Sequence, residues 1–196
     1  MGCGLQGLAS DRSTPPDLGA TAAAPSPHGA GGVLPAPSTP AASRARVTAT
    51  GGAPTDLTIR AIGLRATIRP VQSQYGSLAV PDDPSQVGWW DGGTVPGSPV
   101  GSVVLDGHVD TTAGPGALFR LTQLKPGDAI SLTATGQQRL TYTVTGRRVI
   151  RKAAGLPADL FATTGAPRLV LITCGGPFNH TTRSYQDNIV VFATPT

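Results

Sequence analysis

LVLITCGG, residues 169–176, joins a continuous apolar run to a cysteine and two glycines. The four apolar side chains from Leu169 to Ile172 leave no polar face, which is typical of a strand buried on both sides. The two glycines that follow allow another backbone or a ligand to approach closely. The stretch therefore predicts a central strand that carries Cys174 at its end.

Short apolar or alternating runs, broken by Gly and Pro about every ten residues, extend outward from this strand over residues 56–196. The pattern is typical of a β barrel or a β sandwich. One or two short helices are expected, at residues 117–124 and, as a single turn, at residues 158–162. The predicted strands are Leu57–Ile62, Ala66–Val71, Gly101–Leu105, Ala129–Thr133, Leu140–Val149, Leu169–Thr173 and Ile189–Ala193. We therefore predict one all-β domain over residues 56–196.

Residues 1–55 differ in composition from this domain. The segment from Ser10 to Thr55 has no aromatic residue and repeated prolines, so it cannot bury enough apolar surface to offset its ordering entropy. We expect a disordered Ala/Pro/Gly-rich linker. No apolar run approaches the roughly 18 residues of a membrane span. The Gly2-Cys3 pair ahead of a linker fits a remnant of a lipoprotein signal, or of a membrane anchor if the true start lies upstream.

Charge and cysteine content exclude several classes of protein. The formal charge is +4, from 15 Lys and Arg against 11 Asp and Glu. The cations cluster only from Arg147 to Lys152, where no aromatic residues are interleaved for stacking on bases. We therefore expect no nucleic-acid partner and interpret the cluster as a solvated strand face. Two cysteines are too few for a disulfide framework, so Cys174 is interpreted as a free thiol.

Cys174 and His108 are candidates for nucleophilic chemistry because both follow predicted strands. A lone cysteine at a strand end is more often a small buried hydrophobe. A lone histidine in the sequence DGHVD fits a turn in which it bonds a neighbouring aspartate. Together they form the pair that a thiol nucleophile requires, because the imidazole acts as its base or stabilises its thiolate.

Arg183 lies in a loop that leads from the cysteine strand to the last strand. Its guanidinium is suited to an oxyanion or a substrate carbonyl, although a lone surface arginine paired with Asp187 is the simpler interpretation. A zinc site competes for the same region. His108, Asp110, Cys174 and His180 suffice in number, but no metal-binding spacing connects them. The metal hypothesis is therefore the weaker one.

The order His, Cys, Arg on an all-β chain resembles the sortase family of bacterial cysteine transpeptidases. The resemblance covers residues 56–196 and is carried by four motifs: GHVD at 107–110, FRLTQLKPGD at 119–128, LITCGGPF at 171–178 and RSYQDNIVV at 183–191. The motifs TCGGPF and DNIVV are most similar to the class F sortases of actinobacteria.

This resemblance implies a single eight-stranded β barrel and a transpeptidase of the hydrolase class. Cys174 would attack the Thr–Gly carbonyl of an LPXTG-like sorting signal, His108 would act as general acid and base, and Arg183 would stabilise the oxyanion or the substrate. The thioester would pass to an amine of a peptidoglycan precursor or a pilin, or to water. Thr173 and Asp110 are expected beside the site rather than in catalysis.

The resemblance also implies a setting at the cell surface. We expect a monomer on the extracytoplasmic face of the membrane that anchors surface proteins and needs no cofactor or metal. L,D-transpeptidases are disfavoured, because their arginine would fall at Gly176, and papain-like peptidases place Cys before His. The remaining alternative is a surface-anchored β-sandwich binding module whose cysteine is buried and not catalytic.

Overall fold

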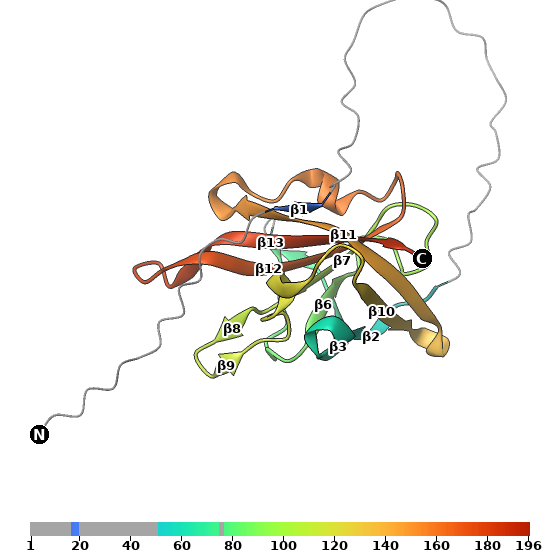
Figure 1. Cartoon of the computed structure of the whole chain (residues 1–196), viewed down its shortest axis with the longest axis horizontal. Coiled ribbons are helices and arrows are strands. Elements are labelled where there is room, and N and C mark those ends of the chain that lie inside the picture. Colours follow the sequence, from blue (N-terminus) through green and yellow to red (C-terminus); the bar gives the residue numbers. More distant parts are fainter. Residues whose placement is uncertain (1–16, 20–50, 75–76) are drawn as a thin grey trace, which may run out of the picture.

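A computed structural model describes residues 17–19, 51–74 and 77–196 (Figure 1). Within these ranges the regular structure consists of β-strands and 3-10 turns. The strands are β1 (Leu18–Gly19), β2 (Pro54–Ile59), β3 (Leu64–Val71), β4 (Ser73–Gln74), β5 (Ser77–Leu78), β6 (Val87–Trp90), β7 (Ser102–Gly107), β8 (Asp110–Thr111), β9 (Gly114–Pro115), β10 (Ala129–Ala134), β11 (Arg139–Arg151), β12 (Arg168–Asn179) and β13 (Ser184–Pro195). The 3-10 turns are η1 (Arg60–Ile62), η2 (Leu121–Gln123), η3 (Thr135–Gln137), η4 (Lys152–Ala154) and η5 (Ala158–Phe161).

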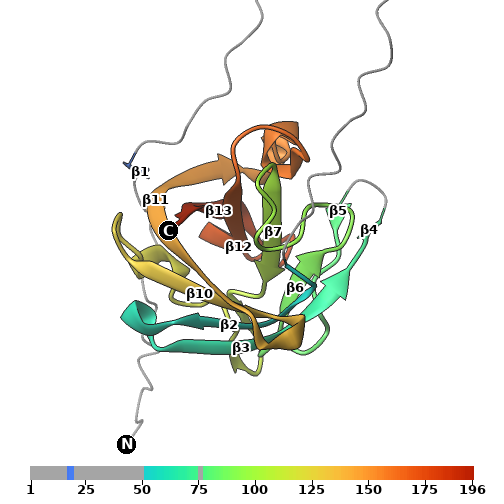
Figure 2. The ribbon, with the colours of Figure 1, turned by 90° about the vertical axis from the view of Figure 1, so that its right-hand side faces the viewer.

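Eight of these strands close into a barrel in the order β11-β10-β2-β3-β6-β7-β12-β13. The long strand β11 closes the ring, because its first part pairs with β10 and its later part pairs with β13 (Figure 2). The pairs β3–β6 and β7–β12 are parallel and the other neighbours are antiparallel. The prediction of a single all-β, eight-stranded barrel is confirmed.

Alternating side chains explain why the strands form a barrel with one core. In β3, Leu64, Ala66 and Ile68 are buried in the barrel, whereas the residues between them are exposed. The central strand β12 is different, because Leu169 and Leu171 fill the barrel while Val170 and Ile172 join a second cluster on its outer face. The prediction that residues 169–172 form a central strand is therefore confirmed.

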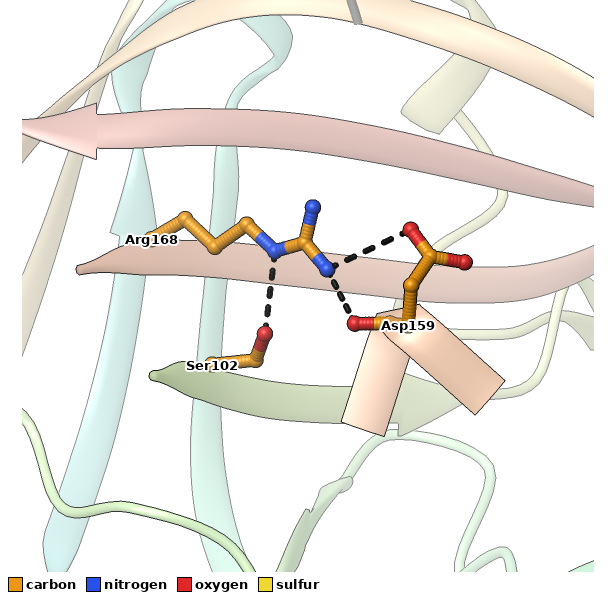
Figure 3. Close-up of polar contacts among 3 residues, drawn as sticks. All are labelled: Ser102, Asp159 and Arg168. Atoms are coloured by element: carbon orange, nitrogen blue, oxygen red, sulfur yellow. Dashed lines mark hydrogen bonds and ion pairs between the residues drawn. The ribbon is translucent and has the colours of Figure 1, made fainter. Parts of the chain in front are cut away.

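The connection from β11 to β12 covers the outer face of β12. Leu156, Leu160 and Phe161 from this connection pack in the second cluster. Arg168 fixes it in place: its Nε donates to Ser102 Oγ at 2.9 Å, and its Nη2 donates to the Asp159 carbonyl oxygen and forms an ion pair with Asp159 Oδ2 at 3.5 Å (Figure 3). The connection is thereby attached to the starts of β7 and β12.

Two local features differ in detail from the sequence analysis. The strand β6 was not predicted, because its four residues include Gly88 and follow a segment rich in Pro and Asp. The predicted helix at residues 117–124 is a 3-10 turn, η2, because the buried side chains of Leu118, Leu121 and Leu124 recur every three residues. Pro126 then prevents a longer helix.

Most of the predicted linker, including Gly2 and Cys3, lies outside the described residues. Two described parts of residues 1–55 are strand rather than linker: β1 pairs with β11, and β2 begins at Pro54. Asp17 Oδ1 accepts a hydrogen bond of 2.6 Å from the Val149 N–H. The pairing of β10 with β11 ends at Thr143, so the edge of β11 beyond that point is available to β1.

Candidate active site

Cys174 lies in β12, just beyond the fully buried residues of that strand. It pairs with Asn188 of β13 and is partly exposed. Beyond it the β12–β13 pairing shifts register between Gly175 and Phe178. Gly176 has a φ of +72°, and a side chain there would collide with the Asp187 carboxylate. Glycine at this position therefore allows β13 to pass close behind the thiol.

His108 follows β7 at the same end of the barrel. Asp106 of β7 and Ile172 of β12 are in register, so His108 and Cys174 each lie two residues beyond a paired position. Thr173 reinforces this alignment, because its buried hydroxyl donates a hydrogen bond of 2.7 Å to the Gly107 carbonyl oxygen. Thr173 thus lies beside the site, as expected.

The His108 ring is oriented by a hydrogen bond of 3.1 Å between its Nε2 and the Pro81 carbonyl oxygen. A carbonyl oxygen can only accept, so Nε2 carries the proton of this bond. The other ring nitrogen, Nδ1, is then the atom that can take up or release a proton.

Arg183 lies at the tip of the β12–β13 hairpin. Asn179 shapes this tip, because its Oδ1 accepts hydrogen bonds from the backbone N–H groups of Thr181 and Thr182, at 2.9 and 3.1 Å. Arg183 then adopts a φ of +51°, which costs a residue other than glycine roughly 1–2 kcal/mol. The left-handed residue turns the chain back toward the site.

His108, Cys174 and Arg183 line one pocket of about 430 Å³. The predicted trio is therefore brought together from three separate parts of the chain. Asp110, at the start of β8, lines the same pocket. A thiol, an imidazole and a guanidinium around one cavity can perform nucleophilic acyl transfer, with a base and an oxyanion donor at hand.

The Sortase domain family model matches residues 57–196 of this chain. The chain belongs to the sortase family. Membership supports the activity of a cysteine transpeptidase, and sortases in general act at the cell surface, on the outer face of the membrane. No helix among the described residues is both long and apolar enough to span a membrane.

Solved sortase structures share this fold at low sequence identity. Sortase C-1 from Actinomyces oris is 23% identical with a TM-score of 0.56, over 72% of this chain and 73% of that chain. Sortase C1 from Streptococcus agalactiae is 18% identical with a TM-score of 0.57, over 72% and 66%. A lid mutant of sortase A from Corynebacterium diphtheriae is 20% identical with a TM-score of 0.56, over 76% and 73%. Direct comparison with curated proteins gives no match.

Tyr185 is a site residue of this sortase that the sequence reasoning missed. Its hydroxyl donates a hydrogen bond of 2.8 Å to Asp110 Oδ2, and its ring packs against Phe178 with centroids 5.0 Å apart. The hydrogen bond joins the β12–β13 hairpin to the β8–β9 hairpin, and the two hairpins extend on the same side of the barrel (Figure 1). A signal was present, because an aromatic residue stands two positions after Arg183.

A second pocket, of about 460 Å³, lies along the outer face of β7 and β12 and also includes His108 and Cys174. Its apolar residues are Leu78, Val80, Leu156, Phe161 and Ile172. We call this second pocket the outer groove. Two charged residues line it as well, Asp106 and Lys152. No local sequence pattern predicted that these two charges would line the same pocket as Cys174.

Burial raises the pKa of the Asp106 carboxyl to about 7, although the Gly107 N–H and the Lys152 charge act in the opposite direction. Lys152 Nζ donates a hydrogen bond of 3.1 Å to Ser184 Oγ at the start of β13. Lys152 lines both pockets, as Cys174 does.

The fourth metal candidate, His180, lies apart from this arrangement. It is exposed in the hairpin tip, where its ring packs against Phe178 with centroids 5.2 Å apart. No group of three or more His, Cys, Asp or Glu residues in the described ranges is arranged to hold a metal ion. Asp110, Cys174 and His108 share the first pocket without His180.

Proposed function

We propose that this sortase cleaves an LPXTG-like sorting signal between Thr and Gly and transfers the acyl group to an amine. The observation that carries the proposal is the shared lining of the 430 Å³ pocket by His108, Cys174 and Arg183. A binding module with a buried cysteine predicts an enclosed thiol, whereas Cys174 is partly exposed and lines the pocket.

The reaction runs in two steps. The Cys174 thiolate attacks the threonine carbonyl, and the Arg183 guanidinium stabilises the oxyanion. The C–N bond breaks as His108 donates a proton to the departing glycine amine, which leaves a thioester on Cys174. An incoming amine then attacks the thioester and gives a proton to His108. The new amide bond forms, and the Cys174 sulfur leaves as the thiolate.

The two pockets beside Cys174 suit the two sides of the cleaved bond. The outer groove has mainly apolar walls, so it suits the segment that precedes the threonine, which begins with an apolar leucine. The 430 Å³ pocket carries His108, Asp110 and Arg183, so it suits the polar glycine side and the incoming amine. Cys174 lies where the two meet.

Finer assignments follow from the motifs and belong to the same proposal. The TCGGPF and DNIVV motifs support a class F sortase of actinobacterial type, acting as a hydrolase-class enzyme. Its acceptor would be a peptidoglycan precursor or a pilin amine. We propose a monomer without cofactor or metal at the extracytoplasmic face of the membrane, with residues 1–55 as a linker and the catalytic domain in residues 56–196.

Single-turnover mass spectrometry of the full chain with an LPXTG peptide tests this function. We expect a peptide adduct that is absent in Cys174→Ala and that passes to an added amine. Arg183→Gln should slow adduct formation by about 100-fold, the usual effect of removing an oxyanion donor. Arg139→Gln, an exposed arginine at the start of β11, is the matched control and should react at the native rate.

One result of this experiment would contradict the proposed transpeptidase activity. If no LPXTG variant gives an adduct and the Cys174 thiol resists alkylation in the folded chain, the transpeptidase proposal fails. The binding module with a non-catalytic cysteine would then be the better description.

A further inference from the structure

Asp106 is a buried carboxyl that the reaction above does not use. It is 9% exposed and lies on β7, where it lines the outer groove together with His108 and Cys174. Its hydrogen-bond partner is the backbone N–H of Gly107. Among the described residues no side chain donates a hydrogen bond to it and none forms an ion pair with it. Lys152 attracts it from a distance, but the Lys152 ammonium bonds to Ser184.

An ionised carboxylate in this position destabilises the folded protein. Buried charges in proteins are normally paired or hydrogen-bonded, because burial penalises the ionised form. The raised pKa of Asp106, about 7, reflects that penalty. The fold supplies one backbone donor, and the remaining oxygen lone pairs face a groove that is open to ligands. A bound group that donates hydrogen bonds would relieve the penalty.

The strand register indicates which part of a substrate would reach Asp106. Asp106 and Ile172 are in register, and His108 and Cys174 follow two residues later on the same face of the two strands. Two residues of strand span about 6.6 Å. An extended peptide covers the same distance with two residues. The carboxyl therefore lies near the residues that precede the threonine acylated by Cys174.

We propose that Asp106 makes the outer groove a subsite for a cationic side chain, lysine or arginine, on one of the two residues that precede the threonine. This inference rests on the proposed function. The aliphatic stem of such a side chain would pack on Leu156 and Phe161, and its charged end would bind the carboxylate. The apolar walls and the carboxyl are then explained together.

Pairs of peptides that differ only in charge provide the test. Each pair carries lysine or Nε-acetyl-lysine at the position before the threonine, or at the one before that. With the full chain, we expect kcat/KM for Cys174 acylation to favour the lysine peptide by about tenfold to 100-fold at one of the two positions. The ratio should fall to about one in Asp106→Asn and persist in Asp106→Glu.

Asp91→Asn is the matched control, because Asp91 is exposed in the β6–β7 connection and lines neither pocket. It should keep the native ratio. The native ratio should also rise between pH 6 and pH 8 as the Asp106 carboxylate forms. The other titratable groups of the groove, His108, Lys152 and Cys174, act on both peptides of a pair, so the ratio removes their effect.

The outcomes separate this inference from the function on which it rests. If native protein acylates both peptides of each pair equally, the cationic subsite is wrong and the transpeptidase stands. A preference that survives in Asp106→Asn also overturns the role of Asp106. If no peptide of any kind is acylated, the proposed function itself fails.

Discussion

The two halves of β12 differ although they form one continuous strand. From Leu169 to Ile172 every side chain is at most 2% exposed, and the pairing with β7 and β13 is regular. From Cys174 onward, every residue except the two buried glycines Gly175 and Gly176 is at least partly exposed, and the pairing with β13 shifts register before Phe178. The first half fixes where the sulfur lies. The second half leaves room around it for a substrate.

The polar groups follow the same division. At the start of β12, Arg168 is bonded to Ser102 and Asp159, so the protein itself satisfies the guanidinium (Figure 3). Closer to Cys174, where Asp106 is in register with Ile172, the Asp106 carboxyl receives one backbone hydrogen bond and faces the outer groove. The Arg168 guanidinium is thus paired within the fold, whereas the Asp106 carboxyl keeps hydrogen-bonding capacity that faces the outer groove.

The largest expected effects come from changing one residue in each half. Leu171→Ala removes a side chain that is 0% exposed from the barrel core, so the free energy of unfolding should fall by about 2–5 kcal/mol. The folded fraction should still acylate, because the thiol is untouched. Cys174→Ala should abolish acylation and change the free energy of unfolding by less than about 1 kcal/mol. Denaturant unfolding and adduct formation measure the two properties.

A different result would contradict the division of β12. If Leu171→Ala lost its chemistry while remaining fully folded, or if Cys174→Ala unfolded the chain, the two halves would not have separate roles. Leu57→Ala, in the same core but on β2, is the control for a cavity that is remote from β12.

The next effect in size is the pH dependence that Asp106 gives to stability. Its pKa is about 7 in the folded chain against 3.8 in the unfolded chain, so the folded state binds the proton more tightly. Stability is therefore unaffected below about pH 4, falls as the pH rises toward 7, and stays lower above that. Asp106→Asn removes this loss of stability, because asparagine does not ionise. We expect the variant to gain about 4 kcal/mol over native protein at pH 8 relative to pH 4.

Thermal or urea unfolding of both proteins at several pH values measures this difference. If the free energies of unfolding of native protein and Asp106→Asn differ by the same amount from pH 4 to pH 8, burial does not destabilise the Asp106 carboxylate. Asp91→Asn, at an exposed position, is the matched control for the change of an aspartate to asparagine.

The buried half of β12 could be predicted from sequence, whereas much of its surroundings could not. Four successive apolar residues imply a central strand whatever the topology, and Cys174 necessarily follows them. His108 and Arg183 were identified because each stands beside a strand end. The role of Asp106 depends on the parallel pairing of β7 with β12, which joins segments that are far apart in the chain. Similarly, β1 forms because β10 leaves part of the β11 edge open, and no local pattern records that.

The smallest expected effect concerns Tyr185. Its ring packs on Phe178 in the exposed half of β12, and its hydroxyl bonds to Asp110 in the segment after His108. Tyr185→Phe removes the hydroxyl that donates to Asp110 and keeps the ring on Phe178. The free energy of unfolding should fall by about 1 kcal/mol or less. Acylation should slow by about three- to tenfold, because the hairpin that carries Arg183 is held less firmly.

Tyr142→Phe, in the barrel core, should cost similar stability without slowing acylation. Equal slowing in both variants would assign the effect to general loosening of the barrel, whereas slowing in Tyr185→Phe alone would assign it to the link between the two hairpins.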